Sequence, residues 1–286
     1  MYYGVKLMMN AKSAWLEGMK NWEGRLPERM IDDQLEESFW DQFLQRKRAE
    51  VATDGYVQEL GRELLSFIEE GDEVLEIGPG WGNYTFAAAS KAGALTCVDS
   101  SASVLGYLER EARAKGLSNM SFVHAKWEEY EPPARHDVVF GVNCYYRMQA
   151  IDQAMANMNN AAKRWAVIGM TSGPEKPHYW EIYEKLGYKI RFSRRDYIHL
   201  TNLLYELGID VNCKIVPLQK TYVYETMEQF VSQNLSAIME TDYDRAKAEA
   251  ILRNHLSWVD GKPAYVHHFK AALLYWRPER TISLTR

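Results

Sequence analysis

The chain has 286 residues, of which 47% are hydrophobic and 26% are charged. This composition is typical of one large globular domain, or of one domain with a cap, and it excludes a disordered or fibrous chain. The net charge of −5 gives no overall attraction to nucleic acids or to anionic membranes. Three cysteines without metal-ligand spacing predict a reduced, cytoplasmic protein. We expect no membrane span and no signal peptide, because no apolar run is long enough and residues 1–15 contain no continuous apolar stretch.

The first 70 residues predict helices. Apolar residues recur at helical spacing over Trp15–Trp22, Leu35–Leu44 and Tyr56–Ile68, and Gly71 ends the third stretch. We expect residues 1–55 to form a helical cap on the domain that follows.

Five short apolar runs come next, separated by helical patterns of about a dozen residues. The runs are Val74–Ile77, Leu95–Val98, Met120–Val123, Val138–Val142 and Trp165–Met170. Such alternation is typical of βαβ units and of a parallel sheet that helices cover on both faces. Residues 56–172 are therefore predicted to form the core of the protein.

The regular alternation ends after Thr171. The pattern predicts strands near Asn212–Pro217 and over Ala264–Trp276, the second of them antiparallel, and helices over Trp180–Leu186, Tyr197–Leu207, Thr226–Ile238 and Tyr243–Trp258. We expect residues 173–286 to complete the sheet and to add helical insertions, after strand 5 and before the last strand, that cover the substrate. The predicted fold class is α/β, with a doubly wound, mostly parallel, seven-stranded sheet.

The segment with the most functional information begins at Glu76 and reads Glu-Ile-Gly-Pro-Gly-Trp-Gly-Asn-Tyr. A strand enters a loop with glycine at every second position, and a helix follows. Glycine permits unusual φ values and lets a ligand lie against bare backbone, while the helix N-terminus presents free N–H groups. Asp99 ends the next strand, 21 residues after Gly78. A carboxylate there can accept both hydroxyls of a ribose, so we expect an adenosine ligand.

The loop sequence discriminates among adenosine ligands. A P-loop requires Lys-Ser or Lys-Thr after its glycines, and this chain has Asn83-Tyr84 there, which disfavours ATP. The dinucleotide fingerprint is G-x-G-x-x-G, whereas this loop is G-x-G-x-G, which disfavours a nicotinamide-dependent oxidoreductase. Glu76 would sit poorly beside a pyrophosphate but suits an ammonium group or a sulfonium-bearing ligand.

This combination of glycine loop and Asp99 resembles the class I S-adenosylmethionine (SAM)-dependent methyltransferase superfamily over residues 70–171. The resemblance implies a Rossmann-like methyltransferase fold with SAM as the cofactor. It also implies that Asp99 binds the ribose with Ser100 nearby, and that the methionyl part of SAM is cradled by Glu76, Gly78, Pro79, Gly80 and Gly82.

Two further strand ends are interpreted through the same resemblance. After the third strand, Lys126 stands where the family often has an aspartate for the adenine amino group, so Trp127 or backbone groups would take the adenine, with Glu128 as a substitute. The end of the fourth strand faces the methyl group and the acceptor in the family. This implies a place beside the cofactor for Asn143 and beside the acceptor for Tyr145, Tyr146 and Arg147.

The predicted function is methyl transfer from SAM to a small-molecule acceptor, with the atom methylated (O, N or S) left open. No nucleic-acid or membrane partner is expected. Protein or RNA methylation and SAM binding without catalysis are the alternatives. No catalytic residue is assigned, because the cofactor carries the reactivity and the protein mainly aligns the reactants. No metal is expected, since the adjacent His267 and His268 would point to opposite faces of a strand.

Overall fold

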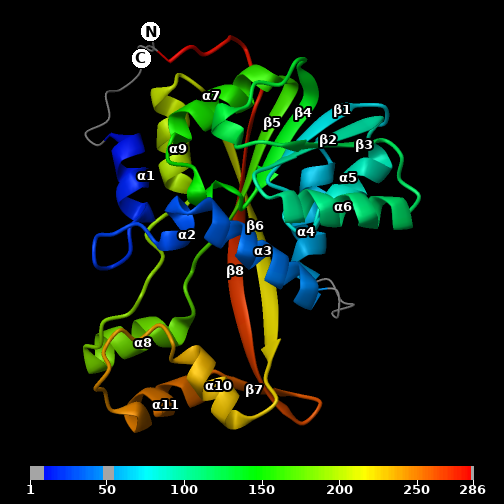
Figure 1. Cartoon of the computed structure of the whole chain (residues 1–286). Helices are drawn as coiled ribbons and strands as arrows, with labels where there is room; N and C mark the ends of the chain where they lie inside the picture. The colour runs from blue at the N-terminus through cyan, green and yellow to red at the C-terminus, as the bar shows by residue number, and fades with distance from the viewer. Residues whose placement is uncertain (1–9, 48–54, 285–286) are drawn as a thin grey trace.

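The structure, a computed structural model, describes residues 10–47 and 55–284 and has a mixed α/β architecture (Figure 1). The strand order of its central sheet is β3-β2-β1-β4-β5-β8-β6, and a short strand, β7, pairs with β8. The first five strands run parallel, whereas β8 is antiparallel to β5, β6 and β7. The strands are β1 (Glu73–Ile77), β2 (Ala94–Asp99), β3 (Met120–His124), β4 (His136–Val142), β5 (Ala162–Ser172), β6 (Asn212–Val223), β7 (Leu256–Val259) and β8 (Lys262–Trp276).

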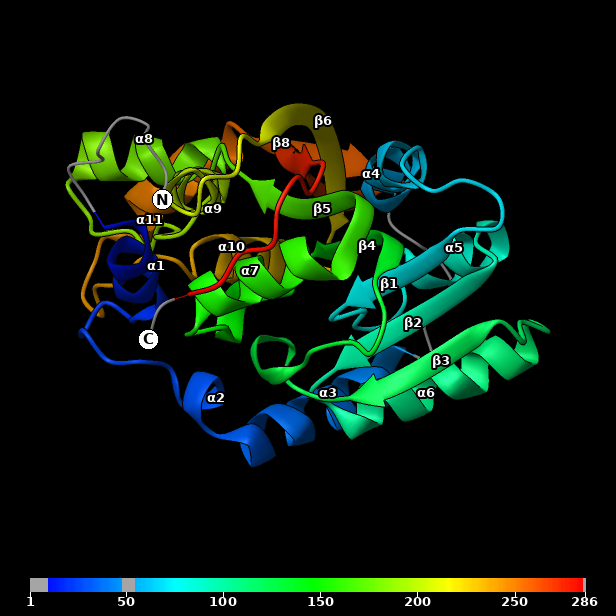
Figure 2. The same ribbon diagram turned by 90° about the horizontal axis from the view of Figure 1, so that it is seen from above.

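Helices cover both faces of the sheet (Figure 2). Alternate strand residues face opposite sides, so each face has its own hydrophobic core. Leu75 and Val139 pack into the core shared with α1 (Ala11–Met19), α7 (Ile151–Ala161) and α9 (Tyr197–Glu206). The neighbouring strand residues Val74 and Val138 pack into the other core. That second core is shared with α4 (Gly55–Leu65), α5 (Thr85–Lys91) and α6 (Ala102–Ala114).

A second lobe extends from the sheet through β6 and β8, which are 12 and 15 residues long (Figure 1). The far ends of these strands and β7 join α8 (Pro177–Leu186), α10 (Met227–Asn234) and α11 (Arg245–Arg253). Ile182, Phe230 and Tyr265 belong to a separate buried core in this lobe. The lobe is therefore held by its own apolar packing.

The N-terminal cap continues with α2 (Glu28–Ile31) and α3 (Asp33–Lys47). The side chain of Asp32 accepts from the N–H groups of Gln34 and Leu35, which fixes the start of α3. Leu44 of α3 packs against α6, and α2 contacts the 3-10 turn η2 (Tyr145–Arg147). A second 3-10 turn, η1 (Trp127–Glu129), follows β3. The cap thereby lies across the carboxyl ends of the parallel strands (Figure 1).

The predicted α/β fold with a mostly parallel sheet is confirmed, but the strand count of seven is one too low. The helix predicted over Tyr243–Trp258 ends at Arg253, and Leu256–Val259 forms β7 instead. Asp260 and Gly261 have φ values of 49° and 76°, which suit the tight turn between two antiparallel strands. The Asp-Gly pair was the sequence signal for this hairpin.

Within residues 10–47 and 55–284, no helix combines the length and the apolar character needed to cross a bilayer. The same ranges contain no group of three or more His, Cys, Asp or Glu residues that could hold a metal ion. Residues 1–9, which include most of the segment examined for a signal peptide, lie outside the described residues.

Candidate active site

A cavity of about 690 Å³ lies between the carboxyl ends of β1, β2 and β4 and the cap helices α2 and α3. Its volume is in the range of small-molecule sites in proteins, about 300–1,000 Å³. Its lining includes eleven of the thirteen residues that the sequence predicted for the site: Glu76, Gly78, Pro79, Gly80, Asp99, Ser100, Lys126, Trp127, Asn143, Tyr146 and Arg147. Gly82 and Tyr145 are not part of the lining.

The glycine loop presents backbone to this cavity. Gly78 and Gly80 have φ values of 58° and 56°, a region that side chains rarely adopt. A Cβ on Gly78 would lie 2.4 Å from the Cβ of Cys144, so only glycine lets the loop approach the end of β4. The N–H of Gly78 donates to the carbonyl of Val98 at 2.8 Å and ties the loop to β2.

Gly82 has a packing role in this structure. Its φ is 84°, and an added Cβ would lie 2.6 Å from the ring of Phe86 and 2.9 Å from Leu108. The third glycine therefore lets the loop pack against α5 and α6, and it does not face the cavity. Its predicted place in the cofactor cradle has no support in this arrangement.

Glu76 places an unsatisfied carboxylate in the cavity wall. Its side chain is only 3% exposed, and its Oε2 atom has no hydrogen-bond partner. Burial raises the pKa of Glu76 to about 8, and the nearby Thr85 side chain opposes that rise. A buried carboxylate with a free oxygen favours a cationic ligand, because a cation would compensate the desolvated charge.

Asp99 lies at the end of β2, across the loop from Glu76. Its Oδ1 accepts from the N–H of Ser101 at 2.8 Å. Ser101, and not Asp99, is the N-cap of α6, since its side chain accepts from Val104. Burial raises the pKa of Asp99 to about 6, although backbone N–H groups of Ser101 and Gly80 stabilise the charged form. The carboxylate is thus fixed by backbone and faces the cavity.

The end of β3 places Lys126 and Trp127 in the cavity wall, as predicted, but protein groups bind their polar atoms. The Lys126 ammonium lies 2.7 Å from Oδ2 of Asp33, the first residue of α3, so this side chain is held by the cap. Trp127 is 2% exposed, and its indole N–H donates to the carbonyl of Ala154. Both residues line the cavity, but their polar atoms are engaged by protein groups.

Asn143, at the end of β4, has a φ of 55° and faces the cavity. Its Oδ1 accepts from both the N–H and the hydroxyl of Thr171. Tyr145, in contrast, is 2% exposed and donates its hydroxyl to the carbonyl of Gly141. Tyr145 therefore belongs to the core beneath the site, which does not support the predicted contact with an acceptor.

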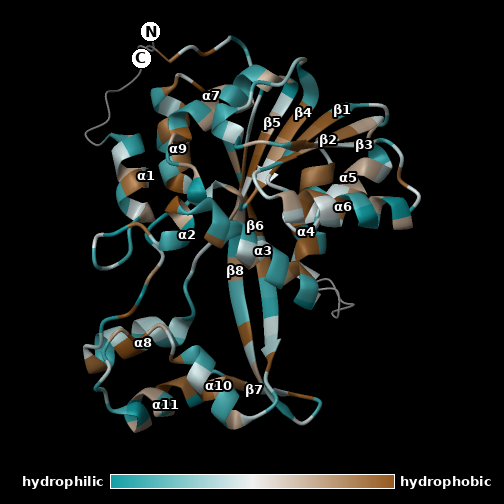
Figure 3. Ribbon diagram, in the orientation of Figure 1, coloured by the Kyte–Doolittle hydropathy of each residue, from teal (hydrophilic) through white to brown (hydrophobic). Residues whose placement is uncertain are grey.

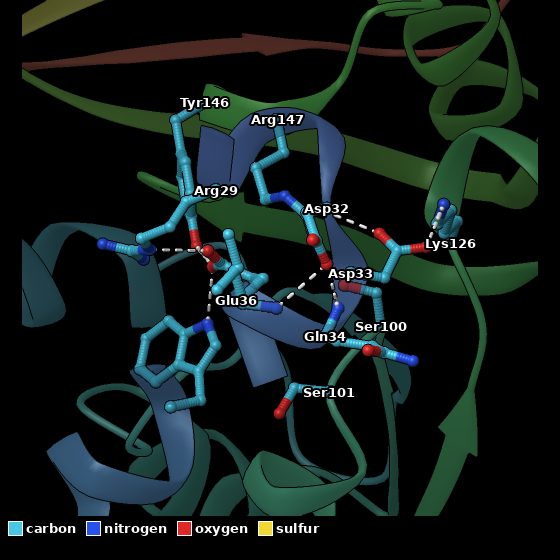
Figure 4. Close-up of polar contacts among 12 residues, drawn as sticks. Arg29, Asp32, Asp33, Gln34, Glu36, Ser100, Ser101, Lys126, Tyr146 and Arg147 are labelled. Atoms are coloured by element: carbon cyan, nitrogen blue, oxygen red, sulfur yellow. Dashed lines mark hydrogen bonds and ion pairs between the residues drawn. The ribbon is translucent and has the colours of Figure 1, made fainter. Parts of the chain in front are cut away.

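A polar network joins the cap to the end of β4 (Figure 4). Glu36 of α3 is 2% exposed and accepts from the Tyr146 hydroxyl, from Trp40 Nε1 at 2.9 Å and from Arg29 Nε at 2.9 Å. Asp33 lies 2.7 Å from Nη2 of Arg147, whose Nε has no partner. No local sequence pattern predicted these cap carboxylates, because each contacts a residue more than 90 positions away in the chain.

Residues 74–164 match the family model of a methyltransferase domain. The strand order and the glycine loop at the end of β1 agree with that match. The chain carries a class I methyltransferase domain. It is accordingly a SAM-dependent enzyme, as the sequence resemblance predicted.

Solved structures share the fold of this methyltransferase at low sequence identity. A Bacillus halodurans protein assigned as a methyltransferase has a TM-score of 0.52 and 16% identity, over 77% of this chain and 99% of that chain. The cyclase SpnF has a TM-score of 0.53 and 15% identity, over 86% and 96%. Haemonchus contortus phosphoethanolamine N-methyltransferase 2 has a TM-score of 0.52 and 16% identity, over 87% of this chain and 60% of that chain. No curated protein matches the sequence.

The residues of the cavity fit the cofactor of the methyltransferase domain. The unpartnered Oε2 of Glu76 offers an acceptor to the ammonium group of SAM, and Asp99 offers one to a ribose. The backbone at Gly78 and Gly80 leaves a cradle without Cβ atoms. These four residues come from β1, its loop and β2, so one edge of the sheet assembles all of them.

Proposed function

We propose that this methyltransferase transfers the methyl group of SAM to a small-molecule acceptor bound under the N-terminal cap. The observation that carries this proposal is the cavity, which is bounded on one side by the glycine loop and Asp99 and on the other by the cap. Trp40 of α3 and Tyr56 of α4 line it as well. A cavity covered in this way favours a small acceptor over a folded macromolecule.

In this proposal Glu76 binds the ammonium group of SAM and Asp99 accepts hydrogen bonds from the ribose hydroxyls. When bound, SAM would supply an electrophilic methyl carbon, which the acceptor would attack in line while the carbon–sulfur bond breaks and S-adenosylhomocysteine leaves. The chain holds the two reactants in alignment and excludes water. Trp40 packs over the loop at Gly80 and would exclude water from the cofactor.

Asn143 and Tyr146 would face the acceptor. Because Thr171 holds Oδ1 of Asn143, the amide nitrogen is directed away from this contact and can donate to an acceptor atom. Burial and the adjacent Glu36 carboxylate raise the pKa of Tyr146, so its hydroxyl stays protonated, donates to Glu36 and can accept a hydrogen bond from the methyl acceptor. Tyr146 therefore positions the acceptor in this proposal and does not deprotonate it.

The test is calorimetric binding of SAM to the wild type, to Asp99→Ala and to Asp41→Ala. The first change removes hydrogen bonds to a charged group, each worth about 1.5–3 kcal/mol, so the affinity for SAM should fall at least about tenfold. Asp41 is exposed on α3, accepts a hydrogen bond from Gln45 and does not line the cofactor cavity, so its replacement should leave SAM binding unchanged. Equal binding by the wild type and Asp99→Ala would refute the ribose assignment.

Turnover is tested by the release of S-adenosylhomocysteine over a panel of small hydroxyl, thiol and amine metabolites. We expect at least one of them to support release at a rate above the SAM-only background. Release with protein or RNA alone would favour a macromolecular acceptor. SAM binding without release in any mixture would favour a binding protein without catalysis.

A further inference from the structure

The two long strands that join the lobes carry polar and aromatic residues on one face. In their antiparallel register Leu218 lies opposite Phe269, Lys220 opposite His267, and Tyr222 opposite Tyr265. Residues two apart on a strand, and residues directly opposite, share a face. One end of this face is buried in the core of the first lobe and the other end in the core of the second. The stretch between the lobes is largely hydrophilic (Figure 3).

Two lysines meet at one tyrosine ring on this stretch. The ammonium of Lys176, which precedes α8, lies 4.5 Å from the centroid of the Tyr222 ring and 5.0 Å from that of Tyr265. The ammonium of Lys220 lies 5.0 Å from the Tyr222 centroid. Aromatic rings attract cations, so Tyr222 keeps both positive charges close to each other.

The charge of Lys176 has no ion-pair partner within the part of the chain that the structure describes. Its ammonium donates to the Oδ1 atom of Asn234 at 2.6 Å, a neutral acceptor. The nearby Glu175 carboxylate accepts from the N–H of Ser193. Burial and the charge of Lys220 lower the pKa of Lys176 to about 8, although Glu175 opposes this shift. An anion placed beside Lys176 would compensate its partly buried charge and favour its charged form.

This lysine pair adjoins the cofactor cavity. The Lys220 ammonium lies 5.6 Å from the ring centroid of Tyr56, which lines the cavity. Tyr56 contacts Phe269 edge to face at 5.5 Å, and His267 stacks on the same Phe269 ring. A molecule extending from the cavity past Tyr56 would therefore reach the lysines.

We propose that Lys176, Lys220 and Tyr222 bind an anionic group of the methyl acceptor, a carboxylate or a phosphate, whose other end reaches the cavity past Tyr56. This inference rests on the proposed function and names the chemical class of its substrate. The second lobe then selects the acceptor by charge, while the first lobe holds the cofactor.

The full chain is first saturated with S-adenosylhomocysteine. Inorganic phosphate or malonate is then titrated into it, and binding is measured by calorimetry. Potassium chloride of equal ionic strength provides the reference. Lys176→Gln removes a charge but retains a donor for Asn234, and Lys220→Gln is a second, independent variant. The matched control is Lys270→Gln on the same strand, since Lys270 pairs with Pro217 and lies on the opposite face.

We expect one or both anions to bind the wild type and the control above the chloride reference. Each of the two test variants should weaken binding by about tenfold or more, because a charge-assisted hydrogen bond is lost. Binding of phosphate alone would identify a phosphate-bearing acceptor, and binding of malonate alone a carboxylate. Absence of binding by both anions, or equal affinity in all variants, would overturn the proposal. Binding of S-adenosylhomocysteine is measured in the same samples, so failure of the cofactor assignment is detected separately.

Discussion

Trp40 of the cap lies directly over Gly80 of the glycine loop. A Cβ built on Gly80 would be 3.4 Å from Cη2 of Trp40, which is ordinary van der Waals contact. The indole is held in this position by its N–H, which donates to the buried Glu36, and by ring contacts with Phe43 and Trp81. The contact joins the N-terminal cap to the part of the domain assigned to the cofactor, although the two lie 40 residues apart in the sequence.

Trp40→Ala should therefore weaken SAM binding by about tenfold, because the loop loses apolar cover and the cofactor gains exposure to water. Trp22→Ala is the control, since Trp22 is 46% exposed and is not part of the cavity lining. Calorimetry on both variants measures the difference. Equal SAM affinity in Trp40→Ala and Trp22→Ala would show that the cap does not cover the cofactor.

The raised pKa of Glu76 predicts a pH dependence of stability. In the ligand-free protein this pKa is about 8 against an ordinary value of 4.5, so between these values the folded state binds more protons than the unfolded state. The free energy of unfolding should therefore fall as the pH rises from about 5 to about 8. SAM affinity should rise over the same range, since the ionised carboxylate binds an ammonium better.

Glu76→Gln is the matching control for this titration. The amide cannot ionise, so the free energy of unfolding should depend less on pH between about 6 and 8. Asp99 also has a raised pKa, of about 6, and its smaller effect on stability should remain below that pH. Urea unfolding at several pH values, with and without SAM, measures both effects. An unchanged slope in the variant would mean that Glu76 titrates in its usual range.

The sequence predicted those features that local patterns determine. The parallel strands are continuous apolar runs, and the glycine spacing with Asp99 defines the cofactor edge within about 25 residues. The contacts that close the cavity were not predictable, because Glu36 and Tyr146 are 110 positions apart. Neither residue is unusual in its own segment, and only the packing of α3 on η2 brings them together.

Tyr145 and Lys126 show a second reason why the contacts of the site could not be predicted. Sequence reasoning assigned them to the site by their position after a strand, but the direction of a side chain there depends on neighbours. The Tyr145 hydroxyl meets the carbonyl of Gly141, and Lys126 meets Asp33 of the cap. Position along the chain identified the correct edge of the sheet, while tertiary contacts decided which side chains reach the cavity.

The two carboxylates that fasten the cap should differ in strength. Glu36→Ala removes a buried acceptor with three partners and should destabilise the protein by about 3 kcal/mol. Asp33→Ala removes ion pairs of a side chain that is 58% exposed, so its cost should be at most about 1 kcal/mol. Hydrogen exchange of the α3 amides, followed with urea unfolding, distinguishes them. Faster exchange in Asp33→Ala than in Glu36→Ala would contradict this order.

Gly78→Ala should abolish SAM binding, because two costs coincide at this position. The φ of 58° is unfavourable for alanine by about 1–2 kcal/mol, and the new Cβ would lie 2.4 Å from Cβ of Cys144. Neither atom can move without displacing backbone at the end of β1 or β4. Gly116→Ala separates the two costs, since its φ is 70° but nothing lies within 4 Å of the added carbon. We expect Gly116→Ala to lose about 1 kcal/mol of stability and to bind SAM normally. Comparable stability and SAM affinity in Gly78→Ala and Gly116→Ala would show that the close approach of Gly78 to Cys144 is not required.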